Sequence, residues 1–137
     1  MNHAAPARNE SGDRSATLHL SALEQSAPAS VLVDDVQHIL HLSANAGRFL
    51  LHSAGPVSNQ LPTVVRPELR LDLRLALTRA LDQKEPTLTH PTVVAFDSER
   101  RRIAMHVVPV PSEAHMGTRA LVFFLDGGRV RGDDTSE

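Results

Sequence analysis

Eight histidines are the side chains of this 137-residue sequence best suited to hold a metal ion. They are His3, His19, His38, His41, His52, His90, His106 and His115. His38 and His41 are an odd number of residues apart on an expected strand, so they face opposite sides and cannot share a metal. A stretch containing prolines separates His106 from His115. The spacing predicts no metal site, and each imidazole is expected at or near the surface.

The sequence contains no cysteine. This excludes thiolate nucleophiles, disulfides, and zinc or iron–sulfur sites built on cysteine. It also fits a protein of a reducing compartment.

Catalysis by acid and base needs paired groups held in a cleft, and the acidic residues do not offer such a pair. Asp34 and Asp35 fall in an expected turn, and Asp72 falls on the polar face of an expected helix. We interpret them as solvated charges, and the basic run 98–102 as a solvated loop tip. The tripeptide Arg-Gly-Asp at 131–133 is identical to an adhesion motif, and we interpret this as a chance match. No catalytic residue is predicted.

Composition narrows the class of protein. Hydrophobic residues make up 41%, enough to build the core of one domain. The net charge is −2, and the aromatic residues are four phenylalanines, which argues against binding nucleic acid. No signal-peptide pattern or long apolar run is present, so we expect no membrane contact and a cytoplasmic protein.

The N-terminal part predicts a disordered lead followed by an amphipathic helix. Residues 1–14 carry almost no large apolar side chain, which is typical of a disordered segment. A helical apolar stripe with Leu18, Ala22 and Leu23 follows and predicts a helix over 15–27. A single short helix is marginal in water, so this one must pack on its own domain or on a second copy.

Two short β-branched runs come next, at 30–35 and 36–43, and acidic turn formers lie between them. They predict a β-hairpin. A short helix is expected over 45–51, and a loop rich in turn-forming residues over 55–62.

The stretch at 67–82 is read as a long helix, although its leucines alternate as they would in a strand. Pro67 suits the first helical turn, and Glu68 suits the positive end of the helix dipole. The residues that share one helical face are predicted to cover the core: Leu69, Leu73, Ala76, Leu77 and Ala80. Leu71 and Leu75 form a second stripe, which is either spare surface or a contact for another element.

The last third predicts three strands, at 87–96, 103–111 and 118–126, and then a polar, flexible tail over 127–137. Pro109 fits a strand end or an edge better than a sheet centre. Five strands with helices between the second and the third indicate an α+β fold. In this fold a five-stranded antiparallel sheet carries helices on one face, and an amphipathic helix precedes it.

This order of elements resembles the PAS sensor domain over residues 28–126. "SVLVDDVQHILHLSANAGRFL" resembles the first PAS hairpin with its short helix. "VVRPELRLDLRLALTRAL" is similar to the long-helix region of PAS domains in hybrid chemotaxis proteins. Those proteins join receptor methyltransferase and methylesterase modules, often with a histidine kinase.

Three positions depart from the PAS pattern. Gln37 stands where the Asp-x-x-Gly turn of many PAS hairpins has its glycine. Ala44 stands where an asparagine is common, and Asn45 follows it. After Asp126 the sequence has Gly-Gly in place of the Ile-Thr that ties many PAS domains to an output helix.

The resemblance also raises the question of a cofactor. Residues 45–50 resemble the stretch by which flavin-binding photoreceptor domains hold a reactive cysteine, but Ala46 and Gly47 cannot form the adduct. Haem-binding PAS domains commonly take their axial histidine from the long helix or beside it, and 67–82 contains none. No cofactor is predicted.

The resemblance places any ligand pocket between the inner face of the sheet and the helices. Its candidate lining is apolar, and the pocket is either open to a small apolar ligand or, as we expect, filled by its own side chains. A register error of one residue would exchange a strand residue of this set for its neighbour. The set comprises Leu42, Phe49, Leu50, Leu61, Val65, Leu69, Leu73, Val94, Phe96, Val107 and Phe123.

The sequence is thus interpreted as a non-enzymatic PAS module for dimerisation and signal relay, with small-ligand sensing left open. A homodimer is expected through the helix near Leu18–Leu23 and the sheet surface. The resemblance implies partners in chemotaxis or two-component signalling. One alternative is a small α+β enzyme or ligand carrier, which would need an acid or base inside its cavity. The other is a haem or flavin sensor.

Overall fold

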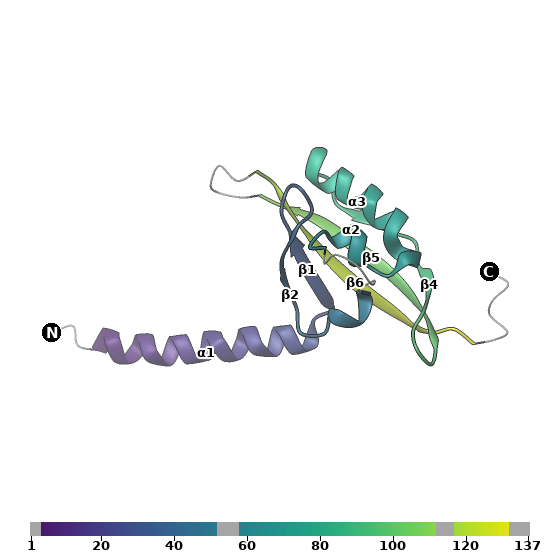
Figure 1. The fold of residues 1–137 in the computed structure, drawn as a ribbon. Coiled ribbons are helices and arrows are strands. Elements are labelled where there is room, and N and C mark those ends of the chain that lie inside the picture. The colour runs from purple at the N-terminus through teal and green to yellow at the C-terminus, as the bar shows by residue number, and fades with distance from the viewer. Residues whose placement is uncertain (1–3, 52–57, 112–116, 132–137) are drawn as a thin grey trace.

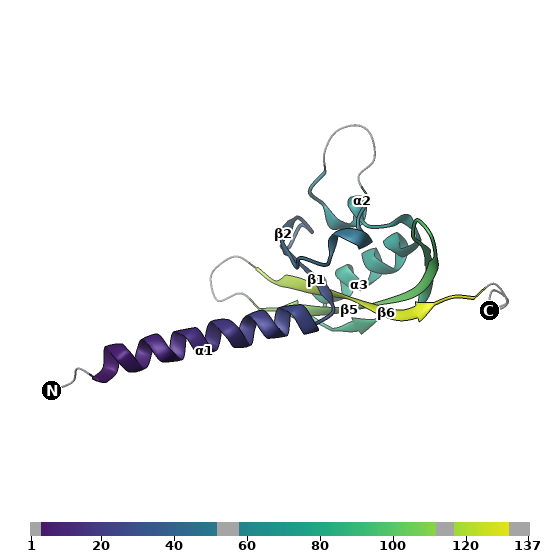
Figure 2. The same cartoon turned by 90° about the horizontal axis from the view of Figure 1, so that it is seen from below.

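The computed structural model describes residues 4–51, 58–111 and 117–131. Within them, an antiparallel sheet of six strands carries the helices of the domain on one face, so the predicted α+β class is confirmed (Figures 1 and 2). Along the sheet the order is β2-β1-β6-β5-β3, and β4 also pairs with β5. The two long strands β5 and β6 lie side by side in the middle of the sheet, and β1, β3 and β4 pair with them.

Helix α1 (Ala4–Ser26) projects away from the sheet in both views (Figures 1 and 2). It begins at Ala4 and not at residue 15, so residues 4–14, which we expected to belong to a disordered lead, are helical. The alanines of this segment are strong helix formers, and Pro6 lies in the first turn, where its missing N–H breaks no helical bond. Pro28 then closes the helix.

Strands β1 (Ala29–Val33) and β2 (Ile39–Leu42) form the predicted antiparallel hairpin. Asp34 organises its turn, because its Oδ1 accepts the backbone N–H groups of Val36 at 3.0 Å and His38 at 2.8 Å. Gln37 has a φ of 73° and therefore occupies the left-handed region that glycine prefers. The turn keeps the geometry of Asp-x-x-Gly without the glycine.

Short helical segments follow: η1 (Gly47–Phe49), α2 (Leu61–Val64) and η2 (Pro67–Leu69). The first confirms the short helix expected there, whereas α2 occupies the end of the segment expected to be a loop. Residues 52–57, which include the start of that expected loop, lie outside the described residues. Leu61 and Val64 are buried, so apolar burial holds this single turn against the core.

Helix α3 (Arg70–Asp82) confirms that the alternating leucines form a helix. Its inner face is the predicted one: Leu73, Ala76, Leu77 and Ala80, with Leu69 just before the helix, are all at most 2% exposed. Leu71 and Leu75 remain 69% and 64% exposed. Helical periodicity therefore overrides the strand-like spacing.

The C-terminal strands are β3 (Thr87–Leu88), β4 (Thr92–Ala95), β5 (Arg100–Val110) and β6 (Arg119–Arg129). The single strand predicted at 87–96 is thus two strands, which makes six strands and not five. Between them the Thr89 N–H donates to the Met105 carbonyl, and Thr89 Oγ1 accepts the Met105 N–H, each at 2.8 Å. The following Pro91, which has no N–H, cannot continue the ladder.

Strand β6 runs past Asp126, where the flexible tail was expected to begin. Gly128 adopts a φ of 110°, and the ladder shifts register between Arg101 and Ile103. The Val130 N–H donates to the Arg100 carbonyl at 2.7 Å, and Val130 is buried. The two glycines therefore form a bulge within β6, and the strand continues beyond them to Arg129.

Candidate functional site

The predicted pocket lining forms the packed interior between the sheet and the helices. Seven of its residues are at most 2% exposed: Phe49, Leu61, Val65, Leu69, Leu73, Val94 and Val107. Leu50 and Phe96 are partly buried and pack against this cluster. Phe49 stacks on Phe124 at 4.6 Å and meets Phe96 edge-on at 5.9 Å between ring centroids.

Two residues of the predicted lining do not belong to this interior. Leu42 is 39% exposed, because β2 is the edge strand. Phe123 lies on the opposite face of β6, against the His106 ring, while its neighbour Phe124 is buried inside. The alternation of a strand places neighbours on opposite faces, so a register error of one residue exchanged Phe123 for Phe124.

Ser43 is the buried polar residue of the described part of the chain. Its hydroxyl oxygen accepts the Ser30 N–H at 2.9 Å, and its hydroxyl donates to Asn45 Oδ1 at 2.6 Å. These bonds satisfy the hydroxyl and fix the corner between β2 and η1. No acidic or histidine side chain is buried among the described residues, so the enzyme alternative has no interior acid or base to use there.

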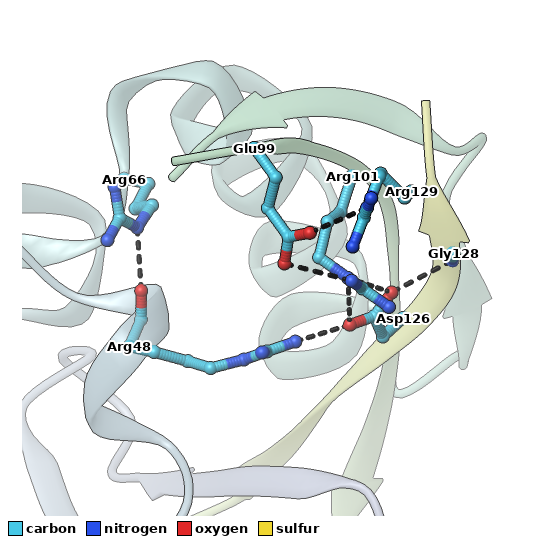
Figure 3. A network of polar contacts seen from close by, with 7 residues as sticks. All are labelled: Arg48, Arg66, Glu99, Arg101, Asp126, Gly128 and Arg129. Carbon is cyan, nitrogen blue, oxygen red and sulfur yellow. Dashed lines mark hydrogen bonds and ion pairs between the residues drawn. The ribbon is translucent and has the colours of Figure 1, made fainter. Parts of the chain in front are cut away.

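The polar groups gather instead at one end of the sheet, around Asp126 near the end of β6 (Figure 3). Arg101 on β5 donates through Nε to both carboxylate oxygens of Asp126, at 2.9 and 2.7 Å. Arg48 of η1 donates to Oδ2, and the Gly128 N–H donates to Oδ1 at 2.9 Å. One carboxylate thus connects the short helix after β2 to both central strands.

Glu99, in the turn between β4 and β5, extends this network. It accepts Arg101 Nη1 through Oε2 and Arg129 Nε through Oε1, each at 2.9 Å. Arg101 and Arg129 lie opposite each other on neighbouring strands, where two like charges repel. The Glu99 carboxylate between them offsets this repulsion.

These ion pairs shift the pKa values of the groups involved. Burial raises the pKa of Asp126, but the Gly128 N–H and the guanidinium groups of Arg101 and Arg48 outweigh it and hold this pKa below its ordinary value. The hydrogen bond from Arg101 lowers the pKa of Glu99 in the same way. Both residues therefore stay ionised at neutral pH.

Aromatic rings connect the network to the core. The Arg48 guanidinium carbon lies over the rings of Phe49 and Phe96, 4.8 and 5.2 Å from their centroids. Arg66 lies 4.4 Å from the Phe96 centroid and donates to the carbonyls of Arg48 and Ala95. Arg48 thus contacts both the phenylalanine rings and the Asp126 carboxylate.

An open hollow of about 520 Å³ adjoins the network at the end of α1. Its walls are Ala27 and Pro28, which follow the helix, together with Arg48, Phe49 and Asp126. The chain enters the domain here, beside the point where β6 leaves it. The hollow is therefore bordered by the end of α1, by core residues and by the C-terminal part of β6.

Reasoning from the sequence missed this site, because the run 98–102 was interpreted as a solvated tip. A local signal was present, since Glu99 and Arg101 carry opposite charges only two residues apart. The long-range partners Arg48 and Asp126 left no local signal. Only the fold brings them together.

The described residues hold no cluster of three metal-ligating side chains, and His3, His52 and His115 lie outside them. Among the described helices none is long and apolar enough to cross a membrane.

No protein-family model matches the chain, and no curated protein matches it. Solved structures do. A sensory box sensor histidine kinase of Vibrio cholerae is 16% identical, with a TM-score of 0.53, over 87% of this chain and 96% of that one. The PAS domain of BvgS from Bordetella pertussis is 16% identical, with a TM-score of 0.55, over 85% of this chain and 88% of that one.

A third similar structure is the PAS domain of nitrogen regulation protein NR(II) from Vibrio parahaemolyticus. It is 17% identical, with a TM-score of 0.53, over 77% of this chain and 94% of that one. Together with the six-stranded antiparallel sheet and its one-sided helices, these structures define the class. The chain has the fold of a PAS sensor domain, as its sequence predicted.

Proposed function

We propose that this chain is a non-enzymatic PAS signalling module that works as a homodimer and relays a signal between α1 and the end of β6. The observation that carries the proposal is the exposure of apolar side chains on α1. Leu18, Leu20 and Leu23 are 71%, 66% and 53% exposed. Leu20 and Leu23 are three residues apart and share one face of the helix, so a second surface that covers this face stabilises the helix.

The uncovered face of the sheet is the surface proposed to do so. The helices cover the other face (Figure 2). On the uncovered face, the residues that alternate with the buried ones along the central strands include a row of apolar side chains. Leu32, Leu121 and Val108 pair across β1, β6 and β5, and Phe123 lies in the next row. Because α1 points away from its own sheet, the proposed partner is the sheet of a second copy.

Relay is favoured over ligand sensing because the interior is occupied by its own side chains. A signal that repacks α1 would act on the hollow beside Ala27, and from there on Arg48 and Asp126. The similar structures include domains of a sensor histidine kinase and of BvgS. We therefore propose cytoplasmic two-component or chemotaxis proteins as the signalling partners.

Sedimentation of the full chain tests the dimer. The expected mass is twice 14.9 kDa for the wild type and 14.9 kDa for the double variant Leu18→Asp/Leu23→Asp. A chain shortened to start at Ala27 should also be monomeric. Leu75→Asp, a substitution at a similarly exposed leucine on α3, is the matched control and should stay dimeric.

A monomeric wild type would contradict the proposal. So would a dimer that survives the double substitution on α1, or one that Leu75→Asp dissociates equally well.

A further inference from the structure

The end of the sheet that holds the polar network carries more guanidinium groups than carboxylates. Arg48, Arg101 and Arg129 share only Asp126 and Glu99. Both oxygens of Glu99 already accept hydrogen bonds from arginines. Three cations against two anions leave one positive charge over.

Two further arginines, Arg66 and Arg100, lie near this network, and their charges are offset by the nearby carboxylates of Glu68 and Asp97. Within the described residues neither Arg66 nor Arg100 forms an ion pair with a carboxylate. Arg66 donates to backbone carbonyls and lies over Phe96, whereas Arg100 is exposed at the start of β5. The nearby Glu68 accepts the Ala95 N–H at 3.0 Å.

Two of these arginines, Arg100 and Arg129, line an open hollow of about 400 Å³ between the turn after β4 and the end of β6. Its lining comprises Phe96, Ser98, Glu99, Arg100, Arg129 and Val130. Arg129 uses its Nε to bind Glu99, and its side chain is still 70% exposed. The hollow thus offers two guanidinium groups, a hydroxyl and an aromatic ring, and also one carboxylate, Glu99, whose two oxygens already accept hydrogen bonds from arginines.

We propose that this hollow binds a small molecule that carries a phosphate monoester on an aromatic group. Guanidinium groups bind phosphate oxygens through paired, charge-assisted hydrogen bonds, and a serine hydroxyl adds a further donor. The Phe96 ring supplies an apolar wall for the aromatic part. A volume of about 400 Å³ leaves room for a small molecule of this kind.

This site lies beyond the proposed dimerisation and relay and can be tested separately. Phenyl phosphate is the probe, and the backbone amide signals of Ser98, Arg100 and Arg129 are followed by NMR in the full chain. We expect saturable shifts at these amides, weaker binding of inorganic phosphate, and no shifts with phenol.

Arg100→Gln and Arg129→Gln should each weaken phenyl phosphate binding about tenfold, which corresponds to the loss of one charge-assisted hydrogen bond. Because Arg100 is exposed and forms no ion pair among the described residues, its substitution leaves the fold intact. Arg74→Gln is the matched control, since Arg74 is an exposed arginine on α3 outside the hollow, and it should not change the affinity.

Three outcomes would overturn the proposal. One is shifts that grow linearly without saturation, and another is an equal loss of affinity in Arg74→Gln, which would indicate general attraction to positive charge. The third is an oligoglutamate peptide that binds the same amides as tightly as phenyl phosphate, which would make the surface a contact for acidic polypeptides.

Discussion

Replacing Gln37 by glycine should stabilise the protein. Gln37 has a φ of 73°, in the left-handed region where a Cβ atom costs about 1–2 kcal/mol. Glycine avoids this cost but gains freedom in the unfolded chain, which takes back about 0.5–1 kcal/mol. The backbone bonds of the turn do not depend on the side chain: the Gln37 N–H donates to the Asp34 carbonyl, and the Gln37 carbonyl accepts the Leu61 N–H.

The expected net gain in the free energy of unfolding is therefore about 0.5–1 kcal/mol, or roughly 2–4 °C in Tm for a chain of this size. Urea unfolding measures it as a higher midpoint at an unchanged m-value. Gln37→Ala is the matched control, because alanine also removes the glutamine side chain but keeps a Cβ at positive φ. It should give no gain.

Two results would refute this reasoning. A Gln37→Gly protein less stable than wild type would mean that the glutamine side chain contributes more than the backbone costs. An equal gain in Gln37→Ala would mean that the side chain, and not the φ angle, is unfavourable.

Three further substitutions test the core, the strand break and the network by urea unfolding. Leu73→Ala should lower the free energy of unfolding by about 2–5 kcal/mol because Leu73 is fully buried. The exposed Leu75 is its control, and Leu75→Ala should change this energy by less than about 0.5 kcal/mol. Equal effects would contradict the assigned helix face. Thr89→Val should cost about 1–2 kcal/mol, since the Met105 N–H loses its acceptor, and no loss would mean that water replaces it. Asp126→Asn should cost about 0.5–1 kcal/mol at neutral pH. The pKa of Asp126 is lowered in the folded state, so its contribution to stability is present above the unfolded pKa of about 4 and is lost as pH falls through the folded pKa. The stability difference between Asp126→Asn and wild type should therefore vanish in acid. A difference that does not depend on pH would contradict the ion pairs.

The sequence was sufficient to predict those elements whose structure depends on residues close together in the chain. Leu69, Leu73 and Leu77 recur at helical spacing, and Pro67 with Glu68 marks a helix start, so both the helix and its buried face followed from the sequence. The resemblance to PAS domains then supplied the fold that the solved structures support.

Long-range contacts could not be predicted in this way. The register of β6 depends on its neighbours, which is why the predicted lining contains Phe123 in place of its neighbour Phe124. Nothing near Asp126 in the sequence shows that Arg48 will reach it. The continuation of β6 through two glycines likewise depends on the facing strand, where the ladder shifts at Arg101.

The central claim is that α1 of one copy covers the outer sheet face of another, and a paramagnetic label tests it most directly. The chain has no cysteine, so Ala22→Cys carries a single nitroxide on α1. This labelled protein, without isotopes, is mixed with isotope-labelled wild type and followed by NMR. We expect the signals of Leu32, Leu121 and Phe123 in the wild-type copy to broaden, while those of Leu75 do not. Unchanged signals at the sheet face, or broadening at Leu75 instead, would contradict it.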